Sequence, residues 1–156
     1  MNKDIKIFTE CRDVYCQEGA RLLGFACMLI FMSKRYSLFQ IATLSLWIQP
    51  AIHHKQIVFL FNKDSVPMGY VTWAHLAPDS QERLLNDPDF LLHPSEWNEG
   101  GNTWIIDFCF PCGNVRESIK KIKRVLKCGG ITRVHWARRY TNHSIRRVGK
   151  CNVVAM

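Results

Sequence analysis

The stretch Trp104-Ile-Ile-Asp-Phe-Cys-Phe-Pro-Cys-Gly113 places one carboxylate, Asp107, inside an otherwise apolar segment that stops at Pro111 and Gly113. Its β-branched and aromatic residues favour a strand, and proline and glycine end it. Burying an ionised carboxylate is costly unless the group is paired or hydrogen-bonded. Asp107 is therefore a candidate for acid–base chemistry, and the alternative is a structural aspartate that accepts backbone hydrogen bonds at the strand end.

On the N-terminal side of this strand, the hydrophobic pattern predicts helices and a hairpin. The apolar run at residues 20–32 predicts a buried helix, and Ser37 to Gln40 has the pattern of a capping box that starts a second helix, with a kink or break near Pro50. Residues 56–61 and 67–74 predict an antiparallel hairpin, in which Gly69 marks a bulge or a close backbone approach.

The remaining segments complete the predicted architecture. A further helix is expected at residues 79–86, beginning with a capping box at Asp79, and another at residues 115–126, which Gly129 and Gly130 end; strands follow at residues 131–140 and 145–148. This order predicts an α/β (α+β) fold, with residues 1–156 in a single domain and a mixed sheet flanked by helices on both faces.

The composition is that of a folded protein. Hydrophobic residues make up 47% and charged residues 22% of the 156 residues, which argues against disorder. The longest apolar run is shorter than the roughly 20 residues of a membrane span, and it starts too late for an ordinary signal peptide. We therefore expect no membrane span and a cytoplasmic location.

Cysteine usage fits a reducing compartment, because the seven cysteines are odd in number and scattered. Cys109 and Cys112 have C-x-x-C spacing, which is a zinc pattern only when a second ligand pair is present. Cys128 and His135 would supply that pair only if the fold happened to bring them close. We therefore expect no metal site.

The formal net charge of +8 indicates an acidic partner. Much of the excess lies near the C-terminus, on a helix (Arg116, Lys120, Lys121, Lys123, Arg124, Lys127) and on the strands that follow it (Arg133, Arg138, Arg139, Arg146, Arg147). An acidic protein and a nucleic acid are both candidates, and a solvated basic face is the alternative. The sequence contains no zinc finger or RNA-recognition signature that would favour nucleic acid.

Several short motifs in order resemble the toxin-activating lysine acyltransferases, the haemolysin C-like proteins of RTX toxin operons. The similarity covers roughly residues 20–113. It consists of Ser33 with an aromatic residue three positions on, Pro50-Ala-Ile52, Gln56, Gly69-Tyr-Val-Thr-Trp-Ala74, Glu96-Trp97, Trp104-Ile-Ile-Asp107 and Pro111-Cys-Gly113.

This resemblance implies a fold similar to that of the Gcn5-related N-acetyltransferases and an acyltransferase activity without a bound cofactor. The enzyme would move a fatty acyl group from acyl carrier protein to lysine side chains of a protoxin or secreted peptide and so activate it. Acyl carrier protein is acidic, which agrees with the basic chain. A homodimer is compatible with the sequence.

The resemblance also implies site residues. The aspartate of the family's W-x-x-D strand corresponds to Asp107, and the family's catalytic histidine, three residues after Ser33, corresponds to Tyr36. A tyrosine with an ordinary pKa near 10 is a poor base but a competent proton donor. Tyr36 is therefore predicted to act as the acid toward the leaving thiolate while Asp107 orients or deprotonates the lysine. Ser33 is predicted to be a hydrogen-bonding, capping or substrate-binding residue and not a nucleophile.

Two alternatives to this mechanism stay open. The first is a catalytically impaired family member that binds acyl carrier protein or toxin without transfer, or a Tyr36 that only packs between the two helices. The second is that a histidine replaces the missing imidazole. The candidates are His53, His54, His75, His93, His135 and His143.

Overall fold

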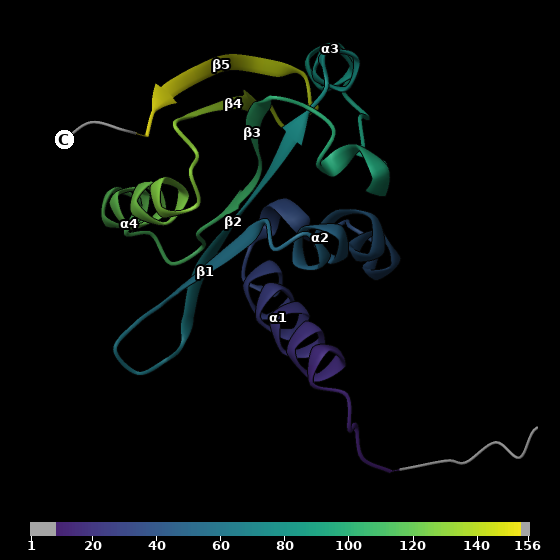
Figure 1. Ribbon diagram of the computed structural model, residues 1–156, viewed down its shortest axis with the longest axis vertical. Helices are drawn as coiled ribbons and strands as arrows, with labels where there is room; N and C mark the ends of the chain where they lie inside the picture. Colours follow the sequence, from purple (N-terminus) through teal and green to yellow (C-terminus); the bar gives the residue numbers. More distant parts are fainter. Residues whose placement is uncertain (1–8, 154–156) are drawn as a thin grey trace, which may run out of the picture.

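The computed structural model describes residues 9–153 and contains a β-sheet with helices on both faces (Figure 1). Its helices and strands, in chain order, are α1 (Val14–Phe31), α2 (Leu44–His53), β1 (Ile57–Phe61), β2 (Pro67–Leu76), α3 (Pro78–Asn86), β3 (Asn102–Cys109), α4 (Val115–Cys128), β4 (Arg133–Arg139) and β5 (Ile145–Asn152). Short 3₁₀ turns lie at η1 (Lys34–Tyr36), η2 (Ile41–Thr43) and η3 (Pro94–Trp97). The predicted α/β class is confirmed.

The sheet has the strand order β1-β2-β3-β4-β5 within the described residues. Neighbouring strands are antiparallel except β3 and β4, which are parallel and are joined by α4. This parallel pair is short, because only Trp104 with His135 and Ile105 with Trp136 are in register. The sheet is therefore mixed, as predicted.

The two faces of the sheet are covered by different helices. On one face, Tyr70 and Ala74 of β2 belong to apolar clusters built with α1, α2 and the segment around η3. On the other face, Val71 and Trp73 pack with Ile122 of α4. Successive side chains of a strand point to opposite faces, so β2 joins both cores. Figure 1 shows α4 on the side of the sheet away from α1 and α2.

The central hairpin forms as predicted, and Gly69 has the expected close backbone approach. A Cβ atom at Gly69 would lie only 2.1 Å from the ring of Phe110, so this position has no room for a side chain. The end of α4 also agrees with the prediction: Gly129 caps the helix, and Gly130 follows with a φ of +78°. Turn and packing glycines were thus correctly assigned.

Helix α1 differs from the prediction in its start and its burial. It begins at Val14, where the Asp13 side chain accepts a hydrogen bond from the backbone N–H of Cys16 at 2.8 Å. The prediction of a buried helix is wrong, because only Ala26 and Leu29 of α1 are buried and its N-terminal half projects from the body (Figure 1). Among the described residues, α1 is long and apolar enough to cross a membrane by length and composition alone, a weak criterion.

Both predicted capping boxes are wrong. Ser37 ends η1 and donates its hydroxyl to the Lys34 carbonyl, and the second α-helix begins only at Leu44. The helix predicted to start at Asp79 forms, but Ala77 is its N-cap and no side chain caps it. Pro50 lies inside α2, which ends three residues later.

Candidate active site

Asp107 reaches the α1–α2 face of the sheet because of a β-bulge in β3. Thr72 of β2 pairs with Asp107, but the next residue, Trp73, pairs with Ile105, so Ile106 has no partner opposite it. Ile106 already packs on the face covered by α2. Strict alternation would send Asp107 to the α4 face, and the extra residue keeps it on the α1–α2 face instead.

The Asp107 carboxylate is buried, with only 5% of its surface exposed, and its oxygens have close hydrogen-bond donors. The hydroxyl of Tyr36 donates to Oδ1 at 2.6 Å and the hydroxyl of Tyr70 donates to Oδ2 at 2.6 Å. The backbone N–H of Phe108 also donates to Oδ1, at 2.9 Å. Asp107 thus anchors a three-residue polar cluster inside an apolar core, and the sequence prediction that such a carboxylate needs partners is confirmed.

Burial dominates the acid–base properties of this cluster. It raises the pKa of Asp107 above its ordinary value, although the hydrogen bonds from Tyr36 and Tyr70 favour the ionised form. Burial and the Asp107 charge also raise the pKa of both phenols. Both tyrosines therefore keep their protons at neutral pH, and Asp107 is a stronger base than an exposed aspartate.

Tyr36 is held over Asp107 by the turn between α1 and α2. Its backbone N–H donates to the Ser33 carbonyl at 3.1 Å, which forms η1. Its ring lies 5.0 Å from the Trp47 ring and 5.6 Å from the Phe39 ring, between centroids, and the guanidinium of Arg35 lies 5.5 Å from its centroid. The aromatic contacts fix the ring so that its hydroxyl reaches Asp107.

A hollow of about 600 Å³ borders Tyr36 between the end of α1 and the η1–η2 link. Its lining is largely apolar and comprises Cys27, Ile30, Phe31, Met32, Ser33, Lys34, Tyr36, Ser37, Phe39, Gln40, Ile41, Leu44 and Trp47. Ser33 is half-buried in this lining and occupies the N-cap position of η1, but its side chain makes no capping hydrogen bond. The predicted capping role of Ser33 is therefore wrong, and its substrate-binding role stays a prediction.

Comparison with known proteins identifies the family of this chain. Residues 16–152 match the model of the RTX toxin acyltransferase family. The chain belongs to the RTX toxin acyltransferase family. It is 34% identical over 76 residues to the leukotoxin-activating lysine-acyltransferase LktC of Pasteurella haemolytica-like sp. (strain 5943B), covering 49% of this chain and 45% of the relative. It is 29% identical over 93 residues to the protein-lysine myristoyltransferase HlyC of Escherichia coli, covering 60% of this chain and 52% of the relative.

The family match is longer than the resemblance found in the sequence, since it continues through α4, β4 and β5. A third relative, the leukotoxin-activating lysine-acyltransferase LktC serotype A1 of Mannheimia haemolytica, is 30% identical over 106 residues, covering 68% of this chain and 62% of the relative. The chain spans about half the length of the curated relatives it matches. The likeness to the Gcn5-related N-acetyltransferase fold stays a prediction.

Tyr70 is a member of the cluster that sequence reasoning missed. Strand periodicity places Tyr70 and Thr72 on the same face, but only the pairing of Thr72 with Asp107 shows that this face meets the carboxylate. Thr72 itself is fully buried, and its hydroxyl has no hydrogen-bond partner within the described residues. The signal available in the sequence was a tyrosine in the predicted strand that precedes the Asp107 strand, since such a tyrosine can donate a hydrogen bond to a buried carboxylate.

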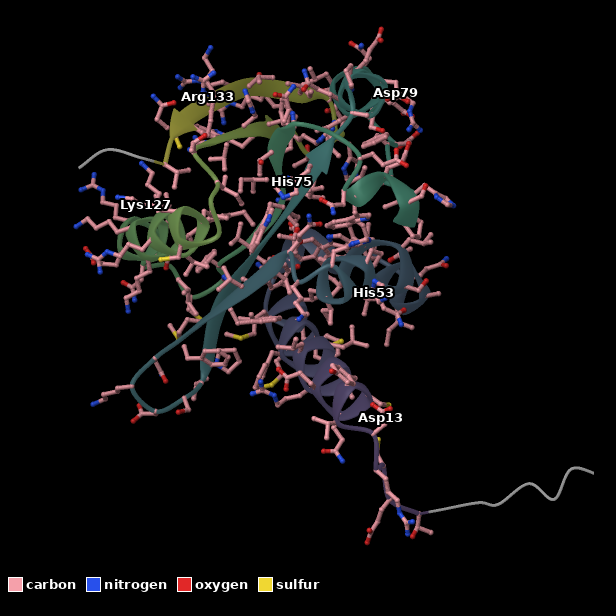
Figure 2. All side chains as sticks on the ribbon, in the orientation of Figure 1. Asp13, His53, His75, Asp79, Lys127 and Arg133 are labelled. Atoms are coloured by element: carbon pink, nitrogen blue, oxygen red, sulfur yellow. The ribbon has the colours of Figure 1, made fainter. Side chains whose placement is uncertain are left out.

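Three of the six histidines lie near the ends of α2 and β2. His53 and His54 stack edge to face at the end of α2, with 5.4 Å between ring centroids. His75 on β2 contacts the hydroxyl of Thr103 through Nδ1 at 2.9 Å. Figure 2 shows His53 and His75 well apart, on α2 and in the sheet. The hydrogen bonds described for Asp107 involve none of them.

The other three histidines have structural contacts. His93 caps η3. His135 stacks on Trp104 with 5.2 Å between ring centroids, and His143 occupies the β4–β5 turn with a φ of 66°. The hydrogen bonds described for Asp107 therefore come from two tyrosine hydroxyls and the backbone N–H of Phe108, and none comes from a histidine.

The cysteines near the site do not form a metal site in the described part of the chain. Cys109 is buried and Cys112 is exposed. Burial raises the pKa of the Cys109 thiol to about 12, so it is a neutral thiol at physiological pH. No group of three or more His, Cys, Asp or Glu side chains suited to a metal ion occurs among residues 9–153.

Proposed function

We propose that this chain is a protein-lysine acyltransferase that moves a fatty acyl group from a thioester to a lysine ε-amino group. The observation that supports this most is the buried hydrogen bond from the Tyr36 hydroxyl to Asp107. It pairs a proton donor with a proton acceptor at the two residues that the motif resemblance assigns to the family's histidine and aspartate. The lysine nitrogen forms an amide bond with the acyl carbon, the carbon–sulfur bond breaks, and a thiol leaves. The lysine loses the protons that the thiolate and the solvent gain.

Asp107 and Tyr36 would move these protons together. The Tyr36 hydroxyl donates to Asp107, so a lone pair on its oxygen is free to accept a hydrogen bond from the attacking amine. As the amine attacks, its proton passes to Tyr36 while the phenol proton passes to Asp107, and no free phenolate forms. The pair then returns a proton to the departing thiolate, so Tyr36 also serves as the acid. Such assistance accelerates a reaction about 100- to 10,000-fold.

Tyr70 would act on the other carboxylate oxygen as a positioning residue. Its hydroxyl donates to Oδ2 at the same 2.6 Å distance, but Tyr70 is fully buried and is not part of the hollow's lining. It therefore holds Asp107 in place without touching substrate. This difference between two otherwise similar tyrosines makes them a natural pair for comparison.

We propose acyl carrier protein as the donor and a protoxin or secreted peptide as the acceptor, in the cytoplasm. The names of the relatives describe toxin activation and, for the Escherichia coli protein, myristoyl transfer to lysine. The basic residues of α4, β4 and β5 offer a complementary surface for an acidic carrier protein. Lys127 and Arg133 mark this surface in Figure 2.

A catalytically impaired binding protein is the second candidate. Tyr36 replaces the imidazole expected at this position, and Tyr36 and Asp107 are each only 5% exposed. A buried phenol with a raised pKa is a weaker acid than imidazolium. This candidate binds the acyl carrier as well as the enzyme would but transfers nothing.

A direct transfer assay separates the two candidates. The purified chain is mixed with acyl carrier protein bearing an isotopically labelled fatty acyl group and with a lysine-containing protein encoded beside it, and intact-mass spectrometry follows the acceptor. We expect a mass increase of one acyl group on a lysine that resists hydroxylamine, as an amide does and a thioester does not. Carrier binding without any acceptor modification would support the impaired protein.

A further inference from the structure

We infer that the hollow beside Tyr36 holds the acyl tail of the thioester, and that Leu44 in its wall limits the chain length that is accepted. This inference rests on the proposed function. The inference adds to the proposed function a binding place for the acyl tail and a residue that determines chain-length specificity.

The lining of the hollow suits a hydrocarbon chain. Ile30, Leu44 and Trp47 form apolar walls that are half-buried or buried, and its volume of about 600 Å³ lies within the 300–1,000 Å³ range typical of small-molecule sites. Phe31 and Ile41 stand at its rim with 78% and 75% of their surfaces exposed. Large apolar side chains gathered around a hollow are typical of a binding site and not of an ordinary surface.

The position of the hollow ties it to the reacting group. Tyr36 is part of its lining, and the hydroxyl of the same ring contacts Asp107. A tail lying along Ile30 and Leu44 therefore ends beside Tyr36, where the thioester carbonyl must be for the proposed proton transfer. Tyr36 therefore links the apolar lining of the hollow to the polar cluster at Asp107.

The charges around the hollow favour this occupant over a second copy of the chain. Residues 19–63 contain five Lys or Arg residues and no Asp or Glu, and Lys34 lies in the lining itself. Two copies meeting through this region would bring like charges together. An uncharged acyl tail adds no like charge to this region, so its binding meets no such repulsion.

Direct binding of acyl-pantetheine thioesters of increasing chain length tests the inference without requiring transfer. Each buried methylene strengthens binding about fourfold, so affinity should rise with chain length until the hollow is full and then level off. In Leu44→Trp the added bulk should move this plateau to shorter chains and weaken binding of the longest chain roughly tenfold or more. Fluorescence titration below the micelle concentration measures both effects.

Leu46→Trp is the matched control, because Leu46 is two residues further along α2, is exposed and is not part of the lining. We expect it to bind every chain length as wild type does. Thermal unfolding verifies that both variants fold, and if Leu44→Trp does not, Ile41→Trp at the exposed rim replaces it.

Equal chain-length profiles for wild type and Leu44→Trp would overturn the inference. So would a change in oligomeric state, measured by sedimentation, in place of a change in acyl binding, because the hollow would then be a contact between copies. Selective tail binding without lysine transfer would leave the hollow assigned and contradict the proposed function. Lysine transfer with an unaltered chain-length profile in Leu44→Trp would support the proposed function and contradict the assignment of the hollow.

Discussion

The α1–α2 face of the sheet and the segment from α4 to β5 differ in charge and in packing, and this difference divides the proposed work between them. The α1–α2 face has the Asp107 cluster and the apolar hollow, in a region without carboxylates from residue 19 to 63. The segment from α4 to β5, residues 115–152, contains twelve of the 21 Lys and Arg residues but one of the 13 Asp and Glu residues. One face therefore suits chemistry in a dry site, and the other region suits long-range attraction of an acidic partner.

The largest effect is expected from Asp107→Asn on the α1–α2 face. The amide preserves shape but removes charge and basicity, so kcat/KM for transfer should fall about 100-fold or more. Carrier binding at the basic region should stay at the wild-type level. Transfer kinetics and carrier titration measure the two effects, with thermal unfolding as the control for folding. Transfer within a few-fold of wild type in the folded variant would reduce Asp107 to a structural carboxylate.

The two tyrosines provide the next comparison, within one face. Both donate to Asp107 at 2.6 Å, but only Tyr36 is part of the hollow's lining. We expect Tyr36→Phe to lower kcat about 100-fold and Tyr70→Phe about tenfold, because only Tyr36 lies where it can exchange a proton with substrate. Single-turnover transfer with saturating donor measures both.

Other results for this pair have distinct meanings. Equal losses in the two Phe variants would make Tyr36 a positioning residue like Tyr70. Full activity of Tyr36→Phe would show that the phenol hydroxyl is not needed and would favour a histidine such as His54 or His75 as the acid–base group. An inactive wild type with an active Tyr36→His variant would identify a degenerated enzyme.

The pH dependence of transfer should report the buried carboxylate. Burial raises the pKa of Asp107, and its ionised form is the base, so activity should fall on acidification at a higher pH than the ordinary aspartate value of about 4. The residual activity of Asp107→Asn should not show this fall on acidification. A profile of kcat/KM against pH for both proteins tests this. A wild-type midpoint at or below the ordinary value would mean that the hydrogen bonds from the tyrosines outweigh burial.

The helices and strands were largely predictable, because they follow from hydrophobic periodicity along single segments. The hairpin, α3, α4 and the Asp107 strand all formed close to their expected residues. The link from Ser33 to Thr43 did not follow its local capping pattern. Its path is set by the Tyr36 ring, which packs on Trp47 and bonds to Asp107, and such distant contacts override a local signal.

The site was half predictable for a similar reason. The cost of burying Asp107 identified it from the sequence, and the family pattern identified Tyr36. Tyr70 and the bulge at Ile106 depend on the register between β2 and β3, which no single segment specifies. Without the bulge, alternation alone would have placed Asp107 on the α4 face, away from Tyr36.

Reversing charge on α4 should affect the basic region alone. Replacing Lys121 and Arg124 with Glu should raise KM for acyl carrier protein about tenfold at low salt without changing kcat, and the effect should shrink at physiological salt, where the Debye length is about 8 Å. Lys55→Glu with Lys63→Glu, an equal charge change elsewhere, is the control. With a small acyl-pantetheine donor, the α4 variant and the control variant should have the same KM. Tighter binding of random DNA than of the carrier would instead favour a nucleic-acid partner.

The smallest effects should appear in stability and contrast the packing of the two faces. On the α4 side, Phe110 presses on Gly69, where a Cβ atom would lie 2.1 Å from the ring, whereas Gly24 of α1 has open space around its Cβ position. Gly69→Ala should therefore lower the free energy of unfolding by about 1–3 kcal/mol, because the ring must move. Gly24→Ala should raise it by about 0.5–1 kcal/mol, because alanine favours a helix at no steric cost. Urea denaturation with matched slopes measures both. Stabilisation by Gly69→Ala would show that the α4 side is as loosely packed as α1, and the contrast between the faces would then be one of charge alone.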